Sequence, residues 1–207
     1  SRAYHNFTKR FWLRDQVYPR IGFDSFDDLD YIKVTMQANG WPTDQGLYAR
    51  ALERIAEAGH DAGPEFHYLV TVETHGPYKE DKQRDVIDGK PHPGITDYHT
   101  RLSRAVSELM KFDAAIEARG RPYVLMVFGD HLPGLRLHQW KSGIKEQSDP
   151  RLHLAPLLVK SSSGNGAALR DRMNGRPFTC LSPMLADALS LGIADRYFRH
   201  LAKRCAA

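Results

Sequence analysis

The feature of the sequence that most constrains its fold is an alternation of amphipathic helical stretches with short apolar runs. Apolar residues recur with helical spacing over 47–57 and again over 98–116. Runs typical of β-strands lie at 66–72, 123–128 and 154–159. Strands and helices in this order are typical of a sheet covered by helices. We therefore predict an α/β fold with a mostly parallel sheet and helices on both faces.

Individual segments refine this prediction. The run Tyr123–Phe128 is continuously apolar, as expected for a strand buried on both faces of a parallel sheet. Pro156 places the last predicted strand at a sheet edge or a bulge. The polar stretch 81–94 is predicted to be an exposed loop, and 179–191 and 197–203 to be helices.

Composition narrows the class of protein. The chain has 207 residues, enough for one domain with a sizeable core, and a net charge of only +4. Its cations are scattered, so we expect no nucleic-acid partner. The longest apolar run is far shorter than the about 20 residues of a membrane span. Cys180 and Cys205 are able to pair, but their spacing leaves open whether they do, and Cys180 has the pattern of a core residue.

Two loops that follow predicted strands carry polar residues suited to chemistry. Ligands in such sheets bind beyond the carboxyl ends of the strands. The oxygen of Asp130 and the nitrogen of His131 are ligands that suit Zn²⁺ or Mn²⁺. The alternative is an aspartate that caps a turn beside a packed histidine. His75 follows the other strand and is able to donate to an anionic oxygen, or to be an ordinary surface histidine.

The amino-terminal stretch 4–15 is dense in aromatic residues and cations. Arg14 offers a planar fork suited to phosphate or carboxylate, and Trp12 an apolar face with one N–H. Packing in the core is the alternative explanation for Phe11 and Trp12. The carboxylates of 27–30 have no partner in a strand-end loop and are predicted to form a solvated turn.

These pieces together resemble a known family, the lipoteichoic acid synthase-like phosphoglycerol transferases of the sulfatase and alkaline-phosphatase superfamily. The resemblance is to the C-terminal half of their catalytic domain and covers most of the chain. It rests on four segments in order: a His-then-Phe-Trp-x-Arg-Asp block, a strand ending in His-x-Pro-Tyr, a Gly-Asp-His motif, and a helix near the domain's end. These segments are His5–Tyr18, Thr71–Tyr78, Phe128–His131 and Pro183–Gly192.

The resemblance implies roles for particular residues. Asp130 and His131 would be two ligands of a single divalent metal, with Mn²⁺ favoured and Mg²⁺, Ca²⁺ or Zn²⁺ as alternatives. A pocket for the phosphoglycerol head group would be lined by His5, Trp12, Arg14 and His75.

The resemblance also implies what lies outside the chain. Residues 1–207 would form the C-terminal portion of a sulfatase-like catalytic domain. The nucleophilic threonine and a further acidic ligand would lie upstream of Ser1, so we expect no catalytic nucleophile here and no turnover by these residues alone. The partners would be a phospholipid head-group donor, a glycan acceptor and the N-terminal half of the same protein. The parent would be membrane-anchored, with this domain outside the cytoplasm.

Two other functions remain open from the sequence. The first is a sulfate or phosphate ester hydrolase of the same superfamily, with water as the final acceptor. The second is a non-catalytic module that uses Trp12, Arg14 and His75 to hold an anionic glycan or head group.

Overall fold

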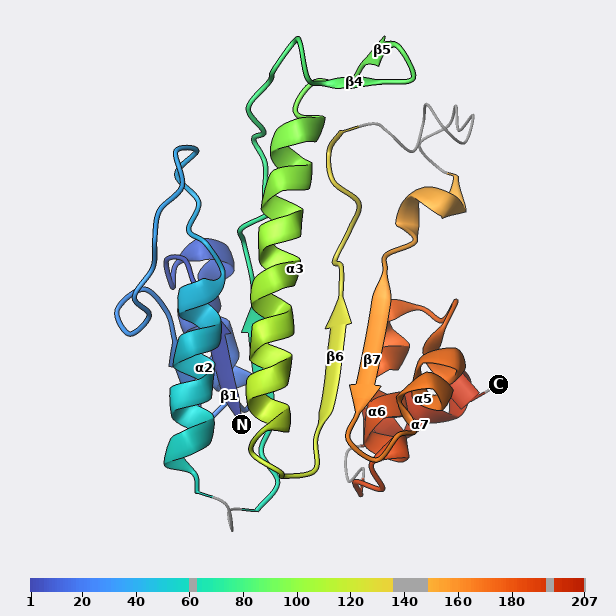
Figure 1. Ribbon diagram of the computed structural model, residues 1–207. Helices are drawn as coiled ribbons and strands as arrows, with labels where there is room; N and C mark the ends of the chain where they lie inside the picture. Colours follow the sequence, from blue (N-terminus) through green and yellow to red (C-terminus); the bar gives the residue numbers. More distant parts are fainter. Residues whose placement is uncertain (60–62, 136–148, 193–195, 207) are drawn as a thin grey trace. The chain divides into compact units, whose positions relative to one another are not determined.

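The computed structural model describes residues 1–59, 63–135, 149–192 and 196–206 (Figure 1). They form two compact units, which we treat separately. Unit 1 comprises the described residues within Ser1–Arg121 and Pro133–Lys141, and unit 2 those within Pro122–Leu132 and Ser142–Ala207. In the described ranges, every helix is too short or too polar to cross a membrane.

Unit 1 is built on a parallel three-stranded sheet. The strands are β1 (Arg2–His5), β2 (Ser25–Asp27) and β3 (His67–Val70), in the order β2-β1-β3. In the central strand, Tyr4 lies opposite Asp27 on one side and Leu69 on the other. The predicted parallel pairing is therefore confirmed in this sheet.

One face of this sheet is covered by helix α1 (Arg14–Arg20). Side chains alternate between the faces of a strand, so Ala3 shares a face with its register partners Phe26 and Tyr68. Tyr18 of α1 packs edge-on against both aromatic rings, with centroids 4.9 and 6.2 Å away. A short 3₁₀ turn, Phe11–Leu13, leads into the helix.

The opposite face is covered by helix α2 (Gln45–Glu57). Arg50 and Arg54 of this helix donate to Asp27 over 2.7 and 3.1 Å. Asp27 is buried, so the prediction of a solvated acidic turn was wrong for this residue. The guanidinium groups of Arg50 and Arg54 replace the hydration that the carboxylate of Asp27 loses on burial. Helices thus lie on both faces, as predicted.

Helix α3 (Ile95–Glu117) packs along α2, and its Arg101 and Arg104 bind the carbonyl of His75 and the carboxylate of Glu73 in the loop after β3. The rings of Tyr48 and Phe112 stack at 5.0 Å between the two helices.

The predicted exposed loop 81–94 was partly wrong, because it contains a small hairpin and a buried carboxylate. The hairpin pairs β4 (Val86–Ile87) with β5 (Lys90–Pro91). The carboxylate of Asp85 accepts backbone N–H groups of Asp81, Gly94 and Thr96. These bonds tie the loop to the start of α3 and hold the pKa of Asp85 at about 2 despite its burial.

Unit 2 contains a two-stranded antiparallel ribbon, whereas the run 123–128 was predicted to lie in a parallel sheet. Strand β6 (Val124–Phe128) pairs with β7 (Leu157–Ser161), and the side chains of β6 are half-buried. A continuous apolar run does not specify the direction of its partner strand, which explains the error. Pro156 precedes β7, and its carbonyl accepts the N–H of Gly129.

The helices in the described part of unit 2 are short. They are η2 (Pro150–His153), α5 (Gly166–Met173), η3 (Phe178–Cys180), α6 (Leu181–Ala188) and α7 (Arg196–Ala206). The helix predicted over 179–191 ends earlier, and Ser190 beyond it has a φ of 54°. Both cysteines are buried in the core between α5, α6 and α7.

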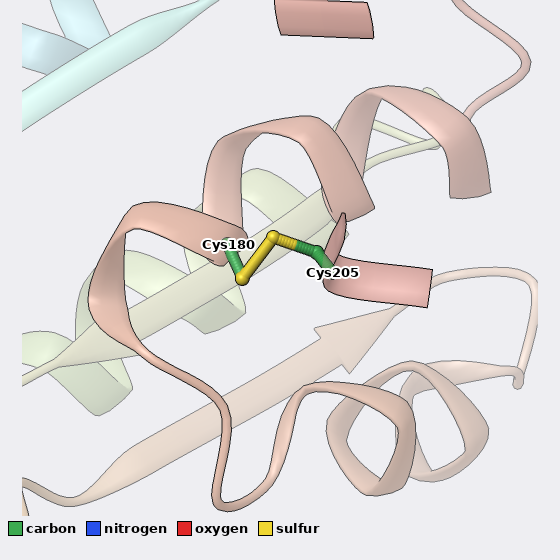
Figure 2. The surroundings of a disulfide bond; sticks show 2 residues. All are labelled: Cys180 and Cys205. Atoms are coloured by element: carbon green, nitrogen blue, oxygen red, sulfur yellow. A yellow bond between two sulfur atoms is a disulfide. The ribbon is translucent and has the colours of Figure 1, made fainter. Parts of the chain in front are cut away.

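A disulfide bond joins Cys180 to Cys205, at the C-terminal end of α7 (Figure 2). The bond closes a loop with a sequence separation of 25 residues. Cross-linking restricts the unfolded chain, and a loop of this length contributes about 3 kcal/mol in the chain-entropy model.

We therefore expect that replacing both cysteines, Cys180→Ala with Cys205→Ala, destabilises unit 2 by about 3 kcal/mol. Amide hydrogen exchange in α6 and α7 measures this change locally. A reducing agent should produce the same loss of protection in the wild-type chain and none in the double variant. Unchanged protection in the double variant would contradict a stabilising role for the bond.

Candidate functional site

The end of strand β1 places a buried histidine next to the first turn of α1. Nδ1 of His5 lies 3.0 Å from the carbonyl oxygen of Val70, and Nε2 lies 3.3 Å from Nη1 of Arg14. A guanidinium only donates, so Nε2 accepts and Nδ1 carries the proton. Burial lowers the pKa of His5 to about 4; the hydrogen bond to Val70 opposes this shift and the charge of Arg14 adds to it. His5 is therefore neutral at neutral pH.

Arg14 is held by three acceptors around the same turn. Besides His5, Nη1 donates to the carbonyl of Phe11 over 2.9 Å, and Nε donates to the hydroxyl of Tyr18 over 3.1 Å. Within the described residues, Nη2 has no protein acceptor. The guanidinium is thus fixed along one edge and keeps a pair of N–H donors for a ligand.

The ring of Phe11 connects all four residues predicted to bind the head group. Its centroid lies 6.1 Å from the ring of His5, 6.0 Å from Trp12 and 6.4 Å from His75. The guanidinium carbon of Arg14 lies 5.5 Å from the same centroid. The structure therefore brings His75, which is distant in the sequence, next to the amino-terminal residues around one aromatic side chain.

Trp12 lies on the outside of this group. Its backbone is left-handed, with φ of 58°, and Leu13 follows with φ of 52°. Positive φ is uncommon for such large residues. This conformation turns the chain sharply and leaves the indole 76% exposed, so Trp12 flanks the site without enclosing it.

His75 lies in the loop after β3, at the carboxyl end of the sheet. Its ring packs against Trp41 with centroids 4.3 Å apart, and its Nδ1 lies 2.6 Å from the carbonyl of Gly76. The indole N–H of Trp41 donates to the same carbonyl over 2.7 Å. Because Nδ1 faces a carbonyl, Nε2 of this exposed histidine remains available to a ligand.

A buried hydrogen-bond network supports the loops that carry the site. Oδ1 of Asp44 accepts from the side-chain amide of Asn6 and from the N–H groups of Val72 and Glu73. Glu73 in turn accepts the N–H of Asp44 over 2.7 Å and pairs with Arg104. Burial raises the pKa of Asp44 to about 6, with Asn6 opposing the shift.

Asp130 and His131 lie beyond β6 in unit 2. Both are exposed, with 83% and 72% of their side chains accessible, and Oδ2 lies 3.5 Å from Nε2. Gly129 permits this turn, because a Cβ there would lie 3.2 Å from Pro156. Nδ1 of His131 lies 2.9 Å from the carbonyl of Leu132.

This pair fits a metal ligand set in part. Ligating histidines commonly donate their second ring N–H to a carbonyl, as Nδ1 of His131 is placed to do, which leaves Nε2 for the metal. Asp130 adds a carboxylate oxygen on the same side. Within the ranges that the structure describes, no group of three or more His, Cys, Asp or Glu side chains gathers to hold an ion. The metal role of the pair stays a prediction.

Sequence reasoning missed two aromatic residues of the site. The sequence pattern favours core packing for Phe11, which lies at the centre of the group, and it does not point to Trp41. Trp41 packs on Phe7 at 4.7 Å as well as on Phe11 and His75. No local motif marks Trp41, because it reaches the site from the segment that precedes α2.

Comparison with known proteins identifies the class. A model of the sulfatase family matches residues 1–180, so this chain belongs to the sulfatase family. It is 31% identical over 181 residues to a Rhizobium meliloti protein to which cyclic beta-1,2-glucan modification is ascribed. That match covers 78% of this chain and 28% of the relative.

A second curated relative is similar over a shorter part of the chain. A lipoteichoic acid synthase of Staphylococcus saprophyticus is 28% identical, over 63% of this chain and 21% of its own length. The chain thus spans about a quarter of the length of these curated relatives.

Solved structures confirm the fold. A phosphoglycerol transferase of Streptococcus pyogenes, in complex with sn-glycerol-1-phosphate, aligns with a TM-score of 0.62 and 18% identity, over 99% of this chain and 57% of that one. The lipoteichoic acid synthase LtaP from Listeria monocytogenes aligns with a TM-score of 0.60 and 22% identity, over 76% and 42%. The fold is therefore of the alkaline-phosphatase and sulfatase type, and the resemblance to lipoteichoic acid synthase-like phosphoglycerol transferases is confirmed.

The buried neutral His5 makes stability depend on pH. Its pKa in the folded chain, about 4, lies below the ordinary histidine value, so the unfolded chain takes up a proton first as the pH falls. Between pH 7 and pH 5 this costs about 2 kcal/mol of stability. Asp44 acts in the opposite direction, because its raised pKa stabilises the folded chain as the pH falls.

The variant His5→Gln separates the two effects. We expect its stability, relative to wild type, to rise by about 2 kcal/mol on going from pH 7 to pH 5, as the histidine penalty disappears. Urea unfolding at both pH values, followed by a probe in unit 1, measures this difference. Identical pH dependence in the two proteins would contradict a buried neutral His5.

Proposed function

We propose that this chain forms the head-group-binding part of a sulfatase-family enzyme that transfers phosphoglycerol groups to a cell-envelope glycan. The observation that carries the proposal is the convergence of His5, Trp12, Arg14 and His75 around Phe11. The names of two relatives, a phosphoglycerol transferase and a glucan modification protein, support the donor group and a glycan acceptor.

Arg14 is the residue best placed to bind the phosphate. Its Nη2 presents N–H donors in a plane, the geometry that phosphate oxygens accept best. His5 acts as a positioning residue, because its Nε2 accepts from Nη1 and holds the guanidinium in place. Since His5 stays neutral, it does not repel the cation that it orients.

His75 and Trp12 suit the glycerol portion of the head group. Nε2 of His75 is placed to hydrogen-bond a hydroxyl, while Trp12 offers an exposed indole face to the carbon chain. One anion-binding arginine beside a hydroxyl-binding histidine and an apolar face matches a small phosphorylated polyol.

Asp130 and His131 would hold one divalent metal; their oxygen and nitrogen donors suit Mn²⁺ or Zn²⁺, and the resemblance to the phosphoglycerol transferases favours Mn²⁺. When bound, such an ion neutralises charge on phosphate oxygens. We propose that the nucleophilic threonine and a further metal ligand are supplied by other parts of the protein, so that these residues alone bind the head group without turnover. The disulfide supports a location outside the cytoplasm, where such bonds persist.

Binding of sn-glycerol-1-phosphate to the chain tests the role of Arg14. We expect Arg14→Lys to weaken binding about tenfold, because an ammonium loses the planar pair of donors. Arg20→Lys is the matched control, an exposed arginine of the same helix, and should bind like wild type. Isothermal titration calorimetry measures both. Equal affinity of the Arg14→Lys variant and wild type would argue against this site.

Binding of Mn²⁺ tests the pair in unit 2. We expect added Mn²⁺ to broaden the nuclear magnetic resonance signals of residues 129–132, with weak affinity because the chain offers two ligands. His131→Gln should abolish the broadening, whereas His153→Gln, at an exposed histidine of the same unit, should leave it intact. Broadening that survives in the His131→Gln variant would place the metal elsewhere.

The reaction itself needs the complete protein. Incubated with a phosphoglycerol lipid and a glycan, it should form phosphoglyceryl-glycan. Release of free glycerol phosphate or sulfate as the main product would indicate the hydrolase instead. Head-group binding with no product from any substrate would indicate the non-catalytic module.

A further inference from the structure

Helix α1 and the turn before it expose an unusual row of large apolar side chains. Leu13, Val17 and Ile21 are 56%, 40% and 64% exposed, and Trp12 beside them is 76% exposed. We call these four residues the α1 ridge. Such side chains normally cover a core, and a cluster of them on the surface marks an interaction site.

The ridge follows from the packing of α1 on the sheet. Tyr18 is buried against the sheet and therefore marks the face of α1 that packs on the sheet. Val17 lies within α1, Leu13 is its left-handed N-cap and Ile21 follows its last residue, so exposed apolar side chains lie at the start, the middle and the end of the helix. In the described part of unit 1, no aromatic partner covers the indole of Trp12 apart from the edge of Phe11.

Cations lie at the ends of the ridge. Arg10 precedes the turn and Arg20 lies in the last turn of α1; both are exposed, and neither forms an ion pair with a described residue. Nearby Asp30 is neutralised by Lys9, whose Nζ lies 2.5 Å away. Residues 10–21 also include Asp15, in the first turn of α1, so their three arginines leave a net charge of +2 beside the apolar side chains.

We propose that the α1 ridge docks this unit on the surface of an anionic lipid bilayer. Trp and aliphatic side chains that enter the interface, with arginines able to reach the lipid phosphates, are the pattern of interfacial membrane-binding helices. Indole rings in particular favour the level of the head groups. The partner is thus a membrane surface of net negative charge.

The size of the ridge favours a membrane over a protein partner. A helix of seven residues is about 10 Å long, whereas a stable protein interface buries about 800 Å² on each partner. A bilayer accepts a few side chains and gains from long-range attraction to cations, so a short ridge is sufficient.

If the proposed function holds, the ridge lies where docking would help the site to reach its lipid substrate. Trp12 and Leu13 directly precede Arg14, the proposed phosphate ligand. A head group that remains attached to its lipid is reached only by a site at the membrane surface. Docking through the ridge would present Arg14 at the level of the lipid phosphates.

Co-sedimentation of the 207-residue chain with vesicles tests the proposal. We expect binding to mixed phosphatidylcholine–phosphatidylglycerol vesicles and much weaker binding to pure phosphatidylcholine. Val17→Ser with Ile21→Ser should weaken binding about tenfold, since two exposed aliphatic contacts are lost. Arg10→Gln and Arg20→Gln should each weaken binding to the anionic vesicles about fivefold.

A matched control comes from α3, where Val106 and Met110 are also exposed and one helical turn apart. Val106→Ser with Met110→Ser should leave vesicle binding unchanged. The proposal is overturned if the wild-type chain ignores anionic vesicles, or if the ridge variant and the α3 variant bind alike. Circular dichroism verifies that both variants remain folded.

Titration with soluble sn-glycerol-1-phosphate measures head-group binding separately from membrane docking, so that failure of one proposal can be told from failure of the other. The Val17→Ser, Ile21→Ser variant should bind this probe like wild type. Vesicle binding through the ridge without any binding of the soluble probe would reject the head-group site and retain the docking surface. The reverse result would retain the site and reject docking.

Discussion

The arrangement of the strand-end loops in unit 1 depends on the buried carboxylate of Asp44. Asp44 accepts hydrogen bonds from Asn6, Val72 and Glu73 through one oxygen, so it connects the end of β1 with the end of β3 at the start of α2. Burial of a carboxylate is costly unless its acceptors are satisfied. These three donors offset that cost and fix two strand-end loops relative to each other, which is what a site at the edge of a parallel sheet requires.

The proposed site is built on the loops that Asp44 holds. The β1 loop leads to Phe11 and Arg14, and the β3 loop leads to His75. Phe11 fills the space between them and contacts the rings of both His5 and His75. Nε and Nη1 of Arg14 are already hydrogen-bonded to Tyr18 and to the carbonyl of Phe11. The orientation of the guanidinium is therefore set before a ligand binds.

Unit 2 achieves its stability in a different way. Within the residues that the structure describes, its two strands form an antiparallel pair, its helices are short, and its core is small. Small cores supply little stability on their own, so a covalent bond between Cys180 and Cys205 has a large relative effect. The bond lies away from the exposed Asp130 and His131 in sequence and leaves their turn to be shaped by Gly129 and Pro156.

The sequence by itself determined the α/β class, the strand-end loops and the family. Periodicity and motifs are local features that can be read directly from the sequence, such as the apolar spacing over 47–57 or the block that holds Trp12 and Arg14. Only the tertiary structure decided that β6 pairs antiparallel, that Asp27 is buried beneath Arg50 and Arg54, and that Trp41 packs on His75. It also decided that the two cysteines are joined. Each of these features depends on contacts between segments that are distant in the sequence. Such contacts produce no periodic pattern of residues, so they cannot be read from the sequence alone.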